Sequence, residues 1–138
     1  MTGPLSRELP AAPAGDEAIL LQRLFDTEPA LGEGEFVPLW PGVDILPLYG
    51  MTAAGAPLDP AGPSAAIIRY APGASVPLHA HRGHEHIVVL SGSQRDDRAI
   101  YPAGTCMINP PGTRHRVTSD EGCLVLAIWN KPVEVIDG

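Results

Sequence analysis

The pattern of hydrophobic and polar residues changes at Phe36. Before that point, one run has the period of an amphipathic helix, with four apolar residues on one face: Leu20, Leu21, Leu24 and Phe25. Asp16 can cap the first turn of such a helix, and Pro29 ends the run. We therefore predict one short helix over residues 16–27, packed against a sheet.

After Phe36, short apolar runs alternate with proline and glycine, which is typical of strands joined by turns. Eight segments are predicted to be strands: 36–40, 43–49, 64–71, 85–91, 98–101, 105–109, 115–118 and 122–130. They recur at intervals of roughly 8–12 residues with no helical pattern between them, as in a β-sandwich or a β-barrel. The fold is therefore predicted to be all-β apart from the one helix.

Length and composition agree with one folded domain. The chain has 138 residues, of which 44% are hydrophobic, and single domains most often hold roughly 100–150 residues. Residues 1–15 contain three prolines and no periodic pattern, so we expect a flexible arm there and one domain over residues 16–138. No apolar run approaches the roughly 18 residues of a membrane span. Because the N-terminus also lacks the features of a secretory signal, we predict a cytoplasmic protein with no membrane partner.

The charge balance argues against nucleic acid as a partner. Sixteen acidic and nine basic residues give a net charge of −7, whereas nucleic-acid-binding domains are typically basic. The excess of acidic residues falls entirely within residues 1–63, and we interpret it as a solvated acidic surface. The two cysteines, Cys106 and Cys123, form no C-x-x-C pair and are interpreted as reduced thiols.

The histidines are concentrated in one part of the chain. All five lie after residue 78, and four of them fall within residues 79–86. His79 and His81 are two residues apart, so on a strand both side chains face the same way. Glu85 has the same parity, although the turn before it can change the phase, and another strand of the same sheet would bring His115 close. Imidazole and carboxylate groups that converge in this way are typical of a metal site.

The sequence around these residues resembles the two signature motifs of the cupin superfamily. The first stretch reads Gly73-x5-His79-x-His81-x3-Glu85-x6-Gly92, and the second reads Gly104-x5-Pro110-x-Gly112-x2-His115. One departure is Ser119, which stands where the second motif often closes with asparagine. Because that asparagine is not a ligand in the family, the resemblance still implies a metal ion bound by four residues: His79, His81, Glu85 and His115.

Within the superfamily, the chain resembles the ChrR-type cupins over roughly residues 36–130. The marks are a short hairpin between the two motifs and three runs: Tyr101–Gly104, Asn109–Gly112 and Glu121–Cys123. The resemblance implies a double-stranded β-helix, the cupin jelly-roll barrel, that commonly assembles as a homodimer. It also implies one of two functions, the metal-binding domain of a zinc-dependent anti-sigma factor or a stand-alone dioxygenase that cleaves diketones or aromatic ketones.

Three imidazoles and one carboxylate suit a single divalent transition metal ion, such as Fe(II), Zn(II), Mn(II), Ni(II) or Cu(II). Four protein ligands leave coordination positions open, where the enolate of a small diketone or hydroxyaryl ketone could bind and react with O₂. Glu85 is also a candidate catalytic base. Arg69 could anchor an anionic substrate, although an outward-facing arginine on a half-exposed strand is the simpler interpretation. Met107 and Trp129 are core or dimer-interface residues that could also line the substrate pocket.

Two other functions stay open at this stage. A regulatory, metal- or ligand-sensing cupin of the anti-sigma type normally carries an N-terminal zinc-binding domain, but residues 1–78 contain no histidine and no cysteine, which disfavours it. A small-molecule-binding protein without catalysis has the same ligand set. The two remaining histidines are not expected to bind the metal: His84 lies in a turn, and His86 alternates with Glu85 and faces away.

Overall fold

A computed structural model describes residues 18–137, and the chain divides into two units between Glu33 and Gly34. The predicted flexible arm, residues 1–15, lies outside the described residues, and the prediction of one domain over residues 16–138 stays a prediction.

The helix predicted over residues 16–27 is wrong across residues 18–27; residues 16 and 17 lie outside the described part of the chain. Gln22 and Ala30 instead form an isolated bridge with two backbone hydrogen bonds of 2.9 Å. Arg23, at φ 54°, has a left-handed conformation that a right-handed helix excludes. The side chain of Phe25 is 62% exposed. A helix this short is marginal unless its apolar face is buried, and here Leu20 and Phe25 of that face are exposed.

The second unit, from Gly34 onward, is built from ten strands. They are β1 (Val37–Trp40), β2 (Val43–Tyr49), β3 (Ser64–Tyr70), β4 (Ala74–Ala80), β5 (Glu85–Arg95), β6 (Ile100–Pro102), β7 (Cys106–Asn109), β8 (Arg114–Ser119), β9 (Cys123–Trp129) and β10 (Glu134–Asp137). Residues 18–137 contain no helix, hence none long and apolar enough to cross a membrane. The predicted all-β class is confirmed.

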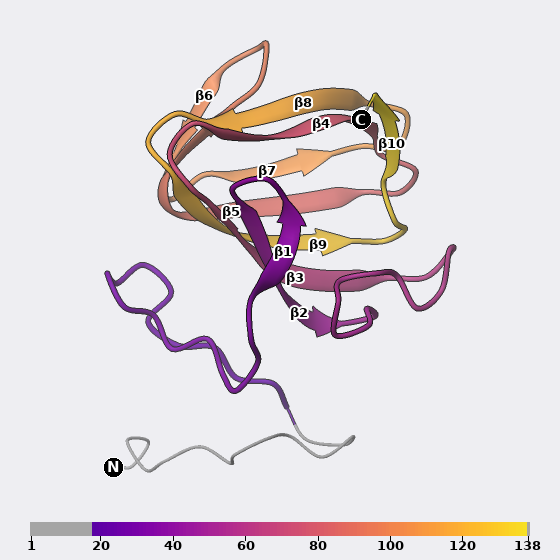
Figure 1. Ribbon diagram of the computed structural model, residues 1–138. Helices are drawn as coiled ribbons and strands as arrows, with labels where there is room; N and C mark the ends of the chain where they lie inside the picture. The colour runs from indigo at the N-terminus through magenta and orange to yellow at the C-terminus, as the bar shows by residue number, and fades with distance from the viewer. Residues whose placement is uncertain (1–17, 138) are drawn as a thin grey trace. The chain divides into compact units, whose positions relative to one another are not determined.

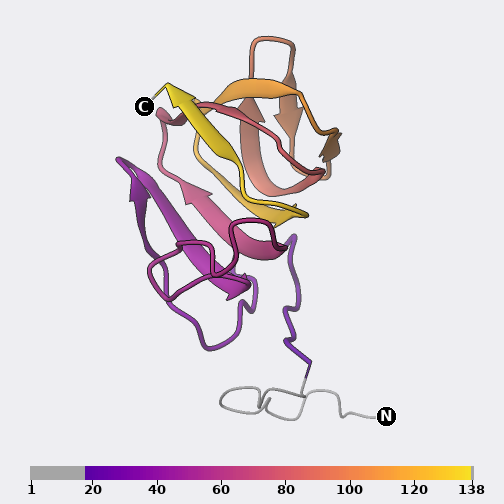
Figure 2. The same ribbon diagram turned by 90° about the vertical axis from the view of Figure 1, so that its right-hand side faces the viewer.

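The ten strands form one antiparallel sheet that curls on itself, in the order β1-β2-β3-β9-β5-β8-β4-β10. The first part of β5 pairs with β7 and β9, whereas its end pairs with β6 and β8. Because β5 belongs to both halves of the sheet, β4 and β8 lie across the barrel from β3 and β9 (Figure 1, Figure 2). This arrangement is the predicted jelly-roll barrel, a double-stranded β-helix.

Gly92 allows β5 to pass from one half of the sheet to the other. The pairing of β5 with β9 shifts register between Val89 and Ser91. Gly92 follows with φ +70°, and a Cβ atom there would lie 2.0 Å from the carbonyl oxygen of Gly122. No other residue fits this position, which explains why the first motif ends in glycine.

The barrel interior follows the two-residue period of the strands. On β9, the residues that face inward are Cys123, Val125, Ala127 and Trp129, and all four are buried, while the residues between them are half-buried. They join one core cluster with inward residues of β2, β3 and β5, among them Val43, Ala66 and Val89. The core thus continues into the space around the histidines.

Two strands, β4 and β10, were not predicted. Proline cannot donate a ladder hydrogen bond, and Pro77 obscures the strand pattern of β4. In the structure Pro77 lies within the register shift between Val76 and His79, where β4 is not paired with β8. β10 is only four residues long and pairs with the end of β4.

Candidate metal centre

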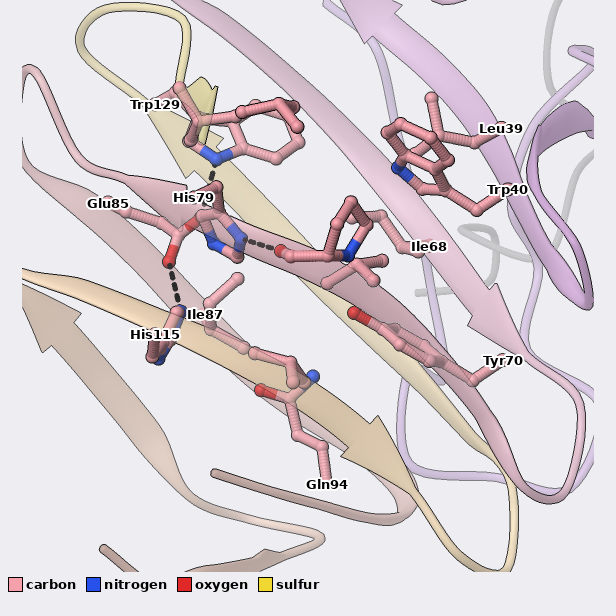
Figure 3. Close-up of a pocket in the computed structure, with 15 residues that line it drawn as sticks. Leu39, Trp40, Ile68, Tyr70, His79, Glu85, Ile87, Gln94, His115 and Trp129 are labelled. Atoms are coloured by element: carbon pink, nitrogen blue, oxygen red, sulfur yellow. Dashed lines mark hydrogen bonds and ion pairs between the residues drawn. The ribbon is translucent and has the colours of Figure 1, made fainter. Parts of the chain in front are cut away.

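Four side chains that can bind a metal ion converge inside the barrel: His79, His81, Glu85 and His115. All four are buried, and their candidate ligand atoms lie within 4.8 Å of one another. His79 and His115 are paired across β4 and β8, and Glu85 opens β5, so three strands meet at this point (Figure 3). The structure therefore brings together the four residues that the motifs single out.

Two of the histidines donate their Nδ1 protons away from the centre of the cluster. The Nδ1 of His79 lies 2.9 Å from the carbonyl oxygen of Pro77. The Nδ1 of His115 lies 3.1 Å from Oδ2 of Asp96. Because both partners are acceptors, each ring carries its proton on Nδ1 and leaves a lone pair on Nε2. Burial lowers the pKa of His79, which favours the neutral ring that a metal requires.

His81 has the same tautomer for a different reason. Its Nδ1 lies 2.9 Å from the hydroxyl oxygen of Thr113. That hydroxyl donates its own proton to the carbonyl of Pro110 at 2.6 Å, so it can only accept from the ring. The Nε2 of His81 is then a bare lone pair 2.9 Å from Oε1 of Glu85, and it has no hydrogen-bond partner. Two facing acceptors at this distance call for a cation between them, so the residues fit a metal ion.

The Pro-Gly turn before His115 holds His81 from the other side. Gly112 has φ +92°, a conformation that favours glycine, and its backbone N–H donates to the carbonyl of His81 at 2.8 Å. The N–H of His81 donates in turn to the carbonyl of Thr113 at 2.8 Å. The second motif therefore supplies one ligand and also positions a ligand of the first motif.

Glu85 is held as a carboxylate by two buried donors. Asn109 Nδ2 donates to Oε1 at 3.0 Å, and Trp129 Nε1 donates to Oε2 at 2.7 Å. Burial raises the pKa of Glu85, but the neighbouring His81 and His79 rings and the hydrogen bond from Trp129 hold the pKa below its usual range. The side chain is therefore a candidate anionic oxygen ligand of fixed orientation.

The donor set excludes a cysteine-rich structural zinc site. Cys106 is exposed and Cys123 is buried, and neither belongs to the cluster. Burial raises the pKa of the Cys123 thiol to about 11, so this thiol stays protonated. A mixed nitrogen and oxygen set suits a divalent first-row ion such as Fe(II), Mn(II), Ni(II), Cu(II) or Zn(II).

A cavity of about 80 Å³ adjoins the cluster, with His79, Glu85 and His115 in its lining. Its walls are largely apolar and include Trp40, Ile68 and Trp129 (Figure 3). The polar exceptions away from the cluster are Tyr70 and Gln94, which are hydrogen-bonded to each other.

Comparison with known proteins identifies the family to which the chain belongs. Residues 30–133 match the ChrR cupin-like domain family. The chain belongs to the ChrR cupin-like family. Its cupin fold thus carries a buried His/Glu cluster that is compatible with a single metal ion.

Individual relatives of this ChrR-like cupin differ in activity. A Cereibacter sphaeroides protein provisionally named dimethylsulfoniopropionate lyase, DddL, is 30% identical over 82 residues, which cover 52% of this chain and 35% of that protein. The structure of Rhodobacter sphaeroides SigE in complex with the anti-sigma ChrR is similar at 26% identity and TM-score 0.59, over 72% of this chain and 51% of that one. An acetylacetone dioxygenase from Acinetobacter johnsonii shares the fold at 13% identity and TM-score 0.65, over 94% and 84% of the two chains.

Among the proposed substrate-binding residues, only Trp129 lines the cavity. Met107 is partly buried and packs against the core without lining this cavity. Arg69 lies on the outside of the barrel, where its side chain is 51% exposed and forms an ion pair with Asp44 at 2.9 Å. The guanidinium also stacks over Phe36, 3.9 Å from the ring centroid. The outward interpretation of Arg69 therefore matches the structure, and the anchoring role inside the barrel does not.

The remaining histidines lie where they were expected. His84 is exposed and His86 is half-buried, and neither belongs to the cluster. Sequence reasoning missed five residues that support the site: Tyr70, Gln94, Asp96, Asn109 and Thr113. Only Asn109 carried a signal, as part of the Asn-Pro-Pro-Gly run, and that signal identified the subfamily rather than a role.

Proposed function

We propose that this ChrR-like cupin is a metal-dependent dioxygenase that acts on a small β-diketone or hydroxyaryl ketone. The observation that carries the proposal is the cavity beside the four candidate ligands, because three of them, His79, Glu85 and His115, form part of its wall. A bound divalent ion would supply a Lewis acid for the two oxygen atoms of an enolate.

The size and lining of the cavity limit the substrate. A volume of about 80 Å³ is small beside the roughly 300–1,000 Å³ of pockets for drug-sized ligands, so the substrate is small or its tail extends out of the cavity. Val135 lines the cavity and is also exposed, and the half-buried Leu39 lines it as well. We therefore place the entrance beside β1 and β10, with apolar walls that select an uncharged tail.

Tyr70 and Gln94 would orient the substrate inside the cavity. Burial, together with the nearby Cys123 and Glu85, raises the pKa of the Tyr70 phenol far above its ordinary value, so the hydroxyl keeps its proton. The Tyr70 hydroxyl points toward the middle of the residues drawn in Figure 3. It would donate a hydrogen bond to a substrate oxygen and would not act as a base.

The lack of a strong base favours a substrate that ionises easily. Both oxygens of Glu85 already accept hydrogen bonds from Asn109 and Trp129, and Tyr70 stays protonated. The central C–H of a β-diketone is acidic enough to need little help from the protein. We therefore propose that Glu85 serves mainly as a metal ligand and plays only a minor part in proton transfer.

A lyase is the second candidate, favoured by the relative that is 30% identical over 82 residues. An elimination reaction also needs a base near the substrate, which the protonated Tyr70 does not supply. A metal- or ligand-sensing role is the third candidate, favoured by membership of the ChrR cupin-like family. Binding without turnover of a small molecule is the observation that this role predicts.

The experiment is an oxygen-electrode assay of the Fe(II), Mn(II), Ni(II), Cu(II) and Zn(II) forms against a panel of small diketones and hydroxyaryl ketones. His81→Ala serves as the metal-free blank, and His84→Ala as the matched control. We expect O₂ uptake by at least one metal form and by its His84→Ala variant, and none by His81→Ala. Consumption of dimethylsulfoniopropionate without O₂ uptake would favour the lyase, and no turnover of any compound would favour sensing.

We also propose that the protein is a homodimer. Among the described residues, β1 pairs only with β2, which leaves a strand edge open, and open edges pair readily with a second chain. Sedimentation at micromolar concentration is the test, and a single species of 14.5 kDa would contradict the proposal. The cytoplasmic location stays a prediction.

A further inference from the structure

Asp96 lies in the turn between β5 and β6, and its side chain is 1% exposed. Its Oδ1 accepts hydrogen bonds from the backbone N–H groups of Arg98 and Ala99, at 2.9 and 3.3 Å, and from the hydroxyl of Tyr101 at 2.9 Å. An aspartate that accepts from the N–H two residues later is a common turn device. The turn thus fixes one oxygen and leaves Oδ2 for His115, 3.1 Å away.

The three histidines of the cluster differ in what holds their Nδ1 atoms. A neutral backbone carbonyl accepts from His79, and a neutral hydroxyl accepts from His81. The acceptor for His115 is the Asp96 carboxylate, which carries a full charge. A hydrogen bond to a charged acceptor is roughly twice as strong as one between neutral groups. It also increases electron density at the opposite ring nitrogen, which makes that nitrogen a better metal ligand.

The charges of the site also match a divalent ion. Glu85 contacts the cluster directly, and Asp96 contacts it through His115. The two carboxylates together bring two negative charges to a buried site, where an unbalanced charge is costly. One divalent cation brings the sum to zero.

We propose that Asp96 is a positioning residue of the metal centre, which holds His115 in the Nδ1–H tautomer and strengthens it as a ligand for a divalent ion. This inference rests on the metal binding that the proposed function requires. It predicts that the β5–β6 turn, which carries no ligand, contributes to metal affinity.

The test is a competition titration of Co(II) and Zn(II) against a chromophoric chelator, with the wild-type protein and three variants. Asp96→Asn keeps the size of the side chain and removes its charge. We expect it to bind metal about 10- to 100-fold more weakly, as is typical when the outer partner of a metal ligand is lost. Tyr101→Phe removes one hydrogen bond from Asp96, and we expect a several-fold loss. Asp97→Asn removes the same charge at the exposed neighbouring position and is the matched control, with no change expected.

A second readout is the tautomer of His115, measured by ¹⁵N NMR on the metal-free wild-type protein, which stays informative even if Asp96→Asn does not fold. We expect the proton on Nδ1. A proton on Nε2 would overturn the inference. If the wild type binds metal, the inference would also be overturned by Asp96→Asn binding Co(II) as tightly as Asp97→Asn. If the wild type binds no metal, the proposed function fails, and this inference fails with it.

Discussion

The cluster of four candidate metal ligands and the apolar core lie in the same barrel and are almost equally buried, yet they place different demands on the sequence. Val43, Val89 and Val125 are fully buried and need only neighbours of the right volume. His81 and Glu85 are nearly as buried, at 2% and 4% exposure, but every polar atom on them needs a partner of the right kind.

This difference teaches which substitutions each region tolerates. An apolar core tolerates substitutions that conserve side-chain volume. A buried polar cluster is destabilised even by a substitution of the same size if a hydrogen-bond donor replaces an acceptor. The contrast can be tested by placing conservative substitutions in both regions and by changing the pH.

Acid should separate the two regions most strongly. A free histidine titrates near pH ~6.5, and protons compete with metal for all three imidazoles, so we expect metal affinity to fall by more than about 10³-fold between pH 6.5 and 4. Burial also lowers the pKa of His79, so the folded protein binds fewer protons there than the unfolded chain. Stability from this group is present above about pH 6.5 and lost as the pH falls.

The lowered pKa of Glu85 acts in the same direction but at lower pH, below the ~4.3 of a free glutamate. Chelator competition and thermal unfolding, measured across about pH 3–8 with and without Zn(II), check both effects. Full metal retention at pH 4 would contradict a shell of imidazoles and a carboxylate.

Removal of one ligand should give the next largest effect. His81→Ala deletes a nitrogen donor whose Nε2 faces Glu85 at 2.9 Å. We expect metal affinity to fall by at least about 100-fold, since even loss of an outer partner costs about 10- to 100-fold. Metal content after dialysis measures this, and wild-type content in the variant would remove His81 from the ligand set.

Glu85→Gln tests the isosteric change in the polar region. Glutamine keeps the shape, but its amide N–H₂ must face either the Asn109 or the Trp129 donor, both of which now donate to Glu85. We expect metal affinity to be at least about 10-fold below that of the wild type, because the ligand loses its charge and one buried donor is left without an acceptor. Isothermal titration with Zn(II) is the measurement. Unchanged affinity would show that the carboxylate is not a ligand.

Ile45→Val tests the matching change in the apolar core. Ile45 is 1% exposed and does not line the cavity. Loss of one buried methylene should lower the free energy of unfolding by about 0.5–1.5 kcal/mol, with no change in metal affinity. Urea unfolding and the same titration check both parts. A loss of metal affinity in this variant would mean that core and cluster are coupled.

The smallest effect is expected at the histidines outside the cluster. His84→Ala and His86→Ala should leave metal content at the wild-type level, because neither side chain is part of the four-residue group. Metal analysis of the purified variants measures this. An empty site in His86→Ala with a filled one in Glu85→Ala would reverse the assignment of the two faces of β5.

The local sequence determined most of the barrel and the set of ligands. Strands such as β9 alternate inward and outward residues along their whole length, so their burial follows from the two-residue period alone. The spacing of His79, His81 and Glu85 needs only one strand end and one turn to converge. Gly92 ends the first motif at a position of positive φ where a Cβ atom would clash with the carbonyl oxygen of Gly122, so only glycine fits there.

Only the tertiary structure decided the elements and roles that depend on distant neighbours. The apolar pattern of residues 18–27 favours a helix, but Leu20 and Phe25 are exposed and Arg23 has a left-handed backbone conformation. Asp96, the hydrogen-bond partner of His115, lies 19 residues away from it along the chain. Trp129, a partner of Glu85, lies 44 residues away from that residue. A side chain's role as hydrogen-bond partner depends on which strands pair, and pairing is a property of the folded barrel, which no local pattern encodes.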